Sequence, residues 1–256
     1  MSRIASRPWL LITFLLTVAG IVHPARAGQE LTLEQVLSRH LEAIGGPAAL
    51  RRVRTLRITL TIVEPGSRFD AVYVADRNMH MRIDILAGGK RLYSEAFDGV
   101  NGWQMGENPG SMKNETAEGS ATLRRGILTA DRFFSLQELA AKGCGFSLAP
   151  RQWIDGVNFY VIHQVLEGAA SDLFVDPRSW LITRTRETKA IHPDRDPTLQ
   201  TTETVYSDFR NVAGVVRAFK SVRTDLKSGV VVQTETLANI ETNPAVDPAF
   251  FTRPRI

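Results

Sequence analysis

The chain has 256 residues, which is ample for a hydrophobic core that needs no disulfide support. Its single cysteine excludes an internal disulfide bond. Three of its 31 basic residues and none of its 27 acids lie in the first 27 positions, so the remainder carries 28 bases against 27 acids and offers no electrostatic basis for nucleic-acid binding.

The N-terminus has the pattern of a secretory signal peptide. Two arginines precede a short apolar run at 9–22, and the small residues of Ala25-Arg26-Ala27 predict cleavage before Gly28. The run is shorter than the roughly 20 residues that a membrane-spanning helix needs, although an uncleaved anchor is an open alternative. We therefore expect a signal peptide at 1–27 and one β-rich domain at 28–256, located in a bacterial periplasm.

One helix is predicted at the start of the mature chain, in LTLEQVLSRHLEAIGG (31–46). Thr32 and Gln35 have the spacing of a capping box, and Gly45-Gly46 is a stop signal. The apolar residues at helical spacing between them are Leu33, Val36, Leu37, Leu41 and Ile44. His40 is predicted to be a solvated residue on this helix.

The hydrophobic period then changes to two. TLRITLTIV (55–63) and NMHMRIDIL (78–86) alternate apolar with polar residues, and RFDAVYVAD (68–76) and KRLYSEAFDG (90–99) are predicted as two further strands. Such alternation indicates strands with one apolar and one wet face, as in an antiparallel sheet. The apolar face of the first two consists of Leu56, Ile58, Leu60, Ile62, Met79, Met81, Ile83 and Ile85. His80 is predicted to face water.

A second helix is predicted from about residue 121 to residue 141, after a polar loop. Its apolar stripe includes Leu123, Ile127 and Phe134, and a helix this apolar must cover other apolar surface. The segment KGCG ends it, and Cys144 within that segment has no nearby base or cation that would activate it. We expect Cys144 to be an inert, buried thiol.

The second half of the chain is predicted to consist of about six strands, separated by turn signals such as EGAA, NVAG and LKSG. FVDPRSWL (174–181) lies between two of these strands, and its Asp-Pro pair is typical of a hairpin turn rather than of a catalytic site. The whole pattern predicts a mainly β, α+β fold with an antiparallel sheet of about ten strands.

Signatures of common enzymes are missing from the sequence, which contains no GxSxG elbow, HExxH motif, phosphate-binding loop or paired cysteines for zinc. His163 and Glu167 would lie about 13 Å apart along one strand, too far for a dyad, so His163 is interpreted as a core or cavity histidine. His192, near Asp194 and Asp196, is interpreted as part of a solvated turn, with weak cation binding as the alternative. We expect no enzymatic activity, no cofactor and no metal.

Four segments resemble the LolA/LolB-like lipoprotein-carrier family: AFDGVNGW (96–103), FVDPRSWLITR (174–184), YSDFRNVAGV (206–215) and NPAVDPAFFTRP (243–254). Each motif is degenerate, and the order and spacing over the mature chain carry the resemblance, which is greatest to the outer-membrane lipoprotein-sorting relatives. It implies a curved, incomplete antiparallel barrel with helices over its concave apolar face. It also implies binding of acyl chains or of a protein, and no gating residue of the family is carried over.

The sequence is compatible with two arrangements of the apolar face. The halves of so wide a sheet could pack together as a dry core, or the sheet could curl around a helix and leave a cavity, which Met79 and Met81 slightly favour. In the second case the eight strand residues above, with Leu123, Ile127 and Phe134, would bind an acyl chain. We expect a monomeric periplasmic carrier of lipid or lipoprotein, with an envelope membrane protein as partner. A regulatory or assembly module and a hydrolase are the alternatives.

Four arginines lie on predicted strands, opposite apolar residues or between them: Arg82, Arg184, Arg186 and Arg217. Most are expected to be solvated. Any that points to the apolar side is a candidate to contact a lipid head group.

Overall fold

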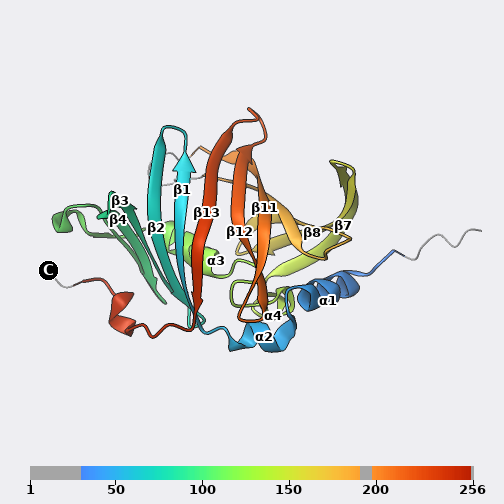
Figure 1. The fold of residues 1–256 in the computed structure, drawn as a ribbon, viewed down its shortest axis with the longest axis horizontal. Helices are drawn as coiled ribbons and strands as arrows, with labels where there is room; N and C mark the ends of the chain where they lie inside the picture. The colour runs from blue at the N-terminus through green and yellow to red at the C-terminus, as the bar shows by residue number, and fades with distance from the viewer. Residues whose placement is uncertain (1–29, 191–197, 255–256) are drawn as a thin grey trace, which may run out of the picture. The chain divides into compact units, whose positions relative to one another are not determined.

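An antiparallel sheet forms the body of the molecule (Figure 1). The computed structural model describes residues 30–190 and 198–254, and the chain from Leu31 onward forms one compact unit. Thirteen strands are assigned in these residues, in the spatial order β6-β5-β4-β3-β2-β1-β13-β12-β11-β10-β9-β8-β7. Neighbours are consecutive in the chain except β1 and β13, and the edges β6 and β7 leave the sheet open. The predicted fold class is confirmed.

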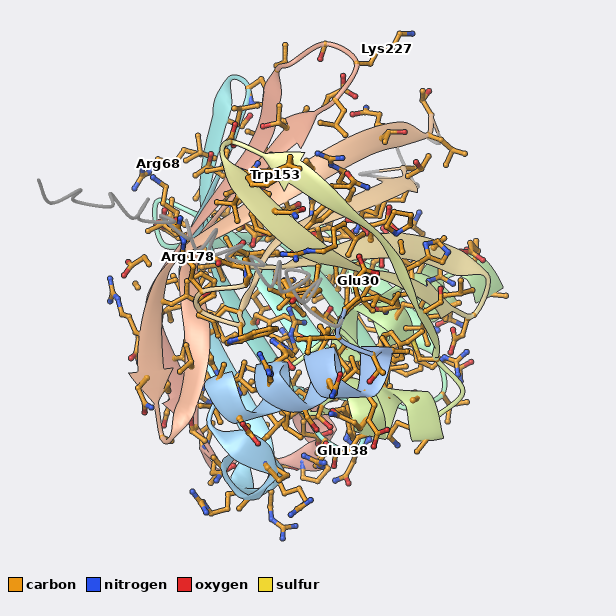
Figure 2. The ribbon with its side chains drawn as sticks, turned by 90° about the vertical axis from the view of Figure 1, so that its right-hand side faces the viewer. Glu30, Arg68, Glu138, Trp153, Arg178 and Lys227 are labelled. Carbon is orange, nitrogen blue, oxygen red and sulfur yellow. The ribbon has the colours of Figure 1, made fainter. Side chains whose placement is uncertain are left out.

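The structure adds two edge strands to those predicted: the short β6 at the end of the first half of the chain and β7 at the start of the second half. Their bounds are β1 (Thr55–Glu64), β2 (Ser67–Asp76), β3 (His80–Ala87), β4 (Lys90–Asp98), β5 (Gly102–Met105), β6 (Lys113–Asn114), β7 (Gly145–Ile154), β8 (Val157–Leu166), β9 (Ala169–Val175), β10 (Ile182–Lys189), β11 (Gln200–Val212), β12 (Val215–Asp225) and β13 (Val231–Thr242). The edge strand β7 contains Pro150 and has no regular alternation of burial, so no period of two marks it. Trp153 on this strand is 73% exposed (Figure 2).

The helices of the described residues are short. They are α1 (Leu33–Ala43), α2 (Gly46–Arg52), α3 (Ala117–Ile127) and α4 (Leu136–Ala141), with 3-10 turns η1 (Pro109–Ser111) and η2 (Pro248–Phe250). The capping box predicted for α1 is confirmed, because Gln35 N donates to Thr32 Oγ1 at 3.3 Å and Thr32 N donates to Gln35 Oε1 at 2.9 Å. Within this part of the chain no helix has the length and apolar character to cross a membrane.

The single helix predicted over residues 121–141 is wrong, because the structure divides it into α3 and α4. Between them the backbone of Asp131 adopts a left-handed conformation, with φ 64°. Ser135 Oγ accepts a hydrogen bond from Glu138 N, and the Glu138 carboxylate accepts one from Ser135 N. This second capping box starts a new helix where the sequence pattern indicates a continuous one.

The chain between β6 and β7 connects opposite edges of the sheet. Because strand order places β6 and β7 at the two ends, residues 115–144 have to cross one face. They do so as α3, the segment Leu128–Ser135 and α4. We call Leu128–Ser135 the plug, and the face that it covers the inner face.

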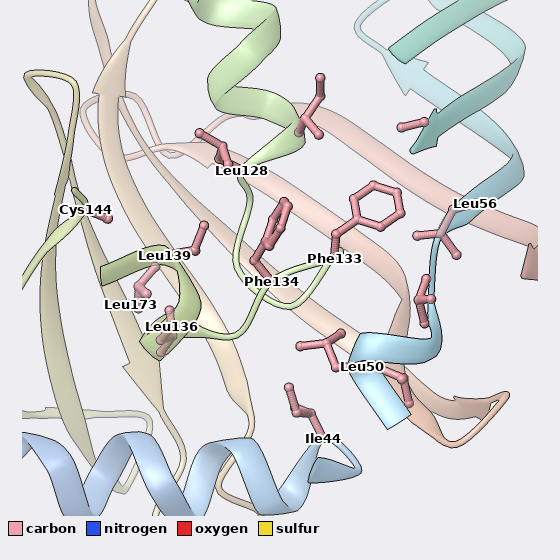
Figure 3. Packing of buried hydrophobic residues seen from close by; sticks show 14 of the residues in the cluster. Ile44, Leu50, Leu56, Leu128, Phe133, Phe134, Leu136, Leu139, Cys144 and Leu173 are labelled. Carbon is pink, nitrogen blue, oxygen red and sulfur yellow. The ribbon is translucent and has the colours of Figure 1, made fainter. Parts of the chain in front are cut away.

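The main hydrophobic core lies between the inner face and the helices (Figure 3). Its members include Leu56 of β1, Leu50 of α2, Phe133 and Phe134 of the plug, and Leu173 of β9, none more than 4% exposed. Burial of each such side chain contributes about 1.5–3 kcal/mol. Both halves of the sheet therefore pack on the plug and the helices, so the core is not a sandwich of one half against the other.

The turn between β9 and β10 is the hairpin that the Asp-Pro pair predicts. Asp176 Oδ1 accepts a hydrogen bond from Arg178 N at 2.7 Å, and Trp180 N donates to the carbonyl of Asp176 at 2.8 Å. Trp180 has a left-handed backbone, with φ 60°. The prediction of a structural turn is confirmed.

Two predictions concern residues that the structure does not describe. The signal peptide at 1–27 and the turn around His192 fall in the ranges 1–29 and 191–197. Both stay predictions.

Candidate ligand-binding face

Most of the apolar residues predicted to bind a ligand lie together on the inner face. Strand pairing arranges them in three rows across β1, β2 and β3: Leu56–Ala75–Met81, Ile58–Tyr73–Ile83 and Leu60–Ala71–Ile85. Ile62, opposite Phe69, extends the same face toward the β1–β2 turn. Met79 differs from the prediction, because it lies in the turn before β3 with φ 73° and only partly packs on the core.

Burial divides these residues into two sets. The buried ones are Leu56, Ile62, Met81, Leu123, Ile127 and Phe134. The half-buried ones are Ile58, Leu60, Ile83 and Ile85. Phe134 contributes from the plug rather than from a helix. The inner face therefore combines a sealed apolar region with an apolar region that keeps part of its accessible surface.

Guanidinium groups hold the plug on the inner face. Arg217 of β12 donates to the carbonyl oxygens of Asp131 and Arg132, at 3.2 and 3.1 Å. Arg77, in the β2–β3 turn, donates to the carbonyl of Phe133. These contacts satisfy backbone acceptors that have no strand partner, so side chains and not a sheet ladder fix the backbone of the plug.

His40, predicted to be solvated, is a buried part of this attachment, and the prediction is wrong. Its side chain is 2% exposed, with Nδ1 2.7 Å from the carbonyl oxygen of Trp180 and Nε2 2.7 Å from Oδ2 of Asp131. Both partners are acceptors when Asp131 is ionised, so both ring nitrogens must carry a proton. Burial opposes this charge, but the charge and hydrogen bond of Asp131 and the Trp180 carbonyl outweigh it and raise the pKa of His40 above 6.5.

Of the four arginines singled out in the sequence, one lies on the inner face. Arg184 and Arg186 share Glu203 on the opposite, outer face, at 2.8 Å each. Arg82 also lies on the outer face, over the ring of Phe250. Arg217 faces inward, and burial lowers its pKa to about 10. Arg217 is bonded to the plug, so it is not a free contact for a head group.

His163 and His80 also differ from their predictions. His163 alternates onto the outer face, 44% exposed, with Nδ1 2.8 Å from Asp172 on the neighbouring strand. It is therefore not a core or cavity histidine. His80 is 27% exposed, lies 2.8 Å from Asp76 and stacks on Phe251 of the C-terminal segment at 5.3 Å, so it does not simply face water.

Cys144 is buried, as predicted. Burial raises the pKa of its thiol to about 11, so the sulfur is protonated and a weak nucleophile at neutral pH. Among residues 30–190 and 198–254, no group of three or more His, Cys, Asp or Glu side chains is placed to hold a metal ion.

Comparison with known proteins gives matches in structure but not in sequence. No family model matches the chain, and no curated protein matches it at a significant level. A LolA superfamily protein from Nitrosomonas europaea superposes with a TM-score of 0.56 and 15% identity, covering 88% of this chain and 99% of that chain.

Two further solved structures agree with the first. A DUF1329 family protein from Desulfovibrio piger has a TM-score of 0.55 and 10% identity, covering 87% of this chain and 98% of its own. A domain named for outer membrane lipoprotein sorting, from Vibrio parahaemolyticus, has a TM-score of 0.54 and 11% identity, covering 85% and 96%. The resemblance predicted from the four sequence segments is confirmed at the level of architecture. This chain therefore has the LolA-type fold, an open and curved antiparallel sheet with helices on its inner face.

Proposed function

We propose that this protein is a periplasmic carrier that binds the acyl chains of a lipid or of a lipidated protein on the inner face of its sheet. The observation that carries the proposal is the half-buried block of Ile58, Leu60, Ile83 and Ile85 beside the sealed core. Scattered apolar residues are normal on a surface, but a contiguous block on a curved, partly covered face is typical of an apolar ligand site.

Two other findings support the proposal. The predicted signal peptide supports a periplasmic location. The fold shared with a domain named for outer membrane lipoprotein sorting supports a carrier rather than an enzyme.

Exchange of the plug for an acyl chain is the mechanism that we infer. Phe133 and Phe134 fill the inner face by packing, while guanidinium contacts that water can replace hold the plug backbone. Each buried methylene contributes about 0.8 kcal/mol, so a 16-carbon chain gains on the order of 12 kcal/mol before costs. That gain is comparable to what holds such a chain in a membrane, so transfer in either direction is feasible without a nucleotide.

Solvent extraction of the purified protein, followed by mass spectrometry, tests this function directly. We expect acyl lipids in amounts comparable to the protein, or uptake of an added fatty acid by protein stripped of lipid. A protein that releases no lipid and takes up no fatty acid would overturn the proposal.

Replacing Ile58 with Lys tests where the chain binds. The charge would lie in the apolar block, and we expect at least about a tenfold loss of affinity for a fluorescent fatty acid, because burying an unpaired charge is costly. Thr59→Lys is the matched control, since the next residue of β1 points to the outer face. Circular dichroism checks that both variants fold. Equal affinities in the two variants would place the acyl chain elsewhere.

A further inference from the structure

The inner face changes character between the two halves of the sheet. On β1–β3 its rows are apolar, but on β11–β13 two neighbouring rows are polar: Glu235–Ser221–Tyr206 and Gln233–Arg223–Thr204. We call these six residues the polar block. Thr204 pairs through Thr185 with Leu173 of the main core, which places the block on the inner face.

The polar block lies toward the β12–β13 turn. This turn carries Lys227, at the end of the sheet opposite Glu138 of α4 (Figure 2). The apolar pair Leu60 and Leu237 lies next to the block along β1 and β13. An acyl chain on the apolar rows would therefore have its polar end within reach of the block.

Arg223 is a half-buried cation that contacts neutral acceptors. In the described residues its Nη1 lies 3.0 Å from Oε1 of Gln233 and its Nε 3.4 Å from Oγ1 of Thr204, and no carboxylate pairs with it. A guanidinium group binds carboxylate or phosphate far more strongly than such neutral oxygens. The outer-face residue Arg184, in contrast, has two carboxylate partners.

Thr202, two residues before Thr204 on the same face, is a buried residue with an unpaired polar atom beside the polar block. It is 1% exposed, and its Oγ1 has no hydrogen-bond partner among the residues that the structure describes. A buried hydroxyl without a partner is rare, because nothing offsets its loss of hydration. An acceptor on a ligand would satisfy it.

Glu235 supplies the opposite charge. Its Oε2 accepts a hydrogen bond from the hydroxyl of Ser221 at 3.2 Å. Because Arg223 pairs with Gln233, Glu235 is its diagonal neighbour, with about 7 Å between the Cα atoms. Two further carboxylates lie nearby: Glu187, which is paired with Lys189 at 2.7 Å, and Glu64, whose Oε1 accepts a hydrogen bond from Nε2 of Gln233 at 3.0 Å.

Tyr206 of β11 pairs with Ser221 and is a diagonal neighbour of Arg223. Its hydroxyl is 3.2 Å from Oγ1 of Thr185. Burial raises the pKa of Tyr206, and although Thr185 and Arg223 lower it, Glu187 and Glu235 raise it further. The phenol therefore stays protonated at neutral pH.

We propose that the polar block binds the head group of an amphiphile, and that this head carries both a phosphate and an ammonium group. The phosphate would lie on Arg223 and the ammonium beside Glu235. A purely anionic head would be repelled by Glu235, and an uncharged head would leave Arg223 without a counter-charge. This inference rests on the proposed function, because the acyl chain must occupy the adjoining apolar rows.

Binding of three single-chain probes to the full-length protein tests the proposal: lysophosphatidylethanolamine, lysophosphatidylglycerol and dodecyl maltoside, each as monomers in calorimetry. We expect Arg223→Gln to lower the affinity for both phospholipids about tenfold or more and to leave the affinity for the maltoside unchanged. We expect Glu235→Gln to weaken only lysophosphatidylethanolamine. Lys220→Gln is the matched control, because it removes a charge from the outer face of β12.

The outcomes separate the two levels of the proposal. If all three probes bind and neither variant changes the order of their affinities, the acyl site stands and the head-group site is wrong. If Arg223→Gln lowers the affinity for the maltoside as much as the affinity for the phospholipids, Arg223 supports the fold and does not contact the head group, so the head-group site is again wrong. If no probe binds the native protein, the carrier function itself fails.

Discussion

At the scale of single residues, His40 connects three separate parts of the chain through its two ring nitrogens. It lies on α1, and its partners are the turn before β10 and the plug. The sequence contains a signal for this burial, because His40 follows Val36 by four residues and precedes Ile44 by four, on the apolar stripe. Its partners are 91 and 140 residues away, and no local pattern identifies them.

The raised pKa of His40 predicts how stability depends on pH. A group whose pKa is higher in the folded than in the unfolded chain contributes fully below its unfolded value, here about 6.5, and loses its contribution as pH rises through the folded value. The free energy of unfolding of the native chain should therefore fall as pH rises from about 6.5 through the raised pKa of His40. Arg217, which donates to the backbone carbonyl of Asp131, keeps its charge over this range, because burial lowers its pKa only to about 10.

Urea unfolding of the native chain and of His40→Gln, at pH values from about 5.5 to about 9, measures this contribution. We expect the variant to be less stable by about 3 kcal/mol at the acidic end, because it leaves Asp131 buried without its counter-charge. The difference should shrink as pH rises. His163→Gln, on the outer face, is the control and should cost under about 1 kcal/mol. Parallel pH profiles for the native chain and His40→Gln would contradict the charged pair.

At the scale of elements, the break between α3 and α4 decides what covers the inner face. A continuous helix would keep Phe133 and Phe134 on one straight axis, whereas the break directs both rings into the core. The sequence Ser135-Leu136-Gln137-Glu138 is itself a capping box and could have indicated the break. The apolar stripe hides it, because residues on both sides of the break are equally apolar.

Ser135→Ala tests the importance of this cap. Losing the side-chain acceptor for Glu138 N should lower the free energy of unfolding by about 1 kcal/mol, measured by urea denaturation. Ser147→Ala is the control, because Ser147 is exposed on the edge strand β7 and should change stability by less than about 0.5 kcal/mol. Equal effects would show that the cap does not hold α4 in place.

The polar block shows where pattern reading fails for strands. The segment TTETVYSDF has no regular alternation, since the inner positions Thr202, Thr204 and Tyr206 are as polar as the outer ones. An inner face can be assigned only when it is the apolar one. The sequence therefore does not show that Arg223 lies beside Thr204, which follows only from the pairing of β11 with β12.

At the scale of the whole molecule, the order of elements and the covered face follow from the sequence, whereas the pairing of distant strands does not. Alternation and turn signals together indicated β1 to β4 and β8 to β13, and the apolar second helix indicated that something covers the sheet. Nothing in the sequence states that β1 pairs with β13, because the register joins residues such as Leu56 and Thr242 across nearly the whole domain.

Truncation tests the role of this pairing. A chain ending at Asp225 lacks β13, so β1 keeps only β2 and β12 keeps only β11 as a neighbour. We expect this chain to lose cooperative unfolding and to aggregate through the two open strand edges. A chain ending at Thr242 keeps every strand and loses only the C-terminal segment on the outer face, so it should unfold cooperatively at lower urea. Cooperative unfolding of the shorter chain, followed by circular dichroism, would show that the two halves of the sheet fold independently.

The central pairing of β1 with β13 also sets when folding can finish. Until the last strand has emerged from the ribosome, the ladder from β6 to β1 and the ladder from β7 to β12 are not joined, and the facing edges of β1 and β12 have unpaired backbone groups. Because β13 is the last strand of the described residues, we expect the two halves of the sheet to join only after residue 242 has emerged.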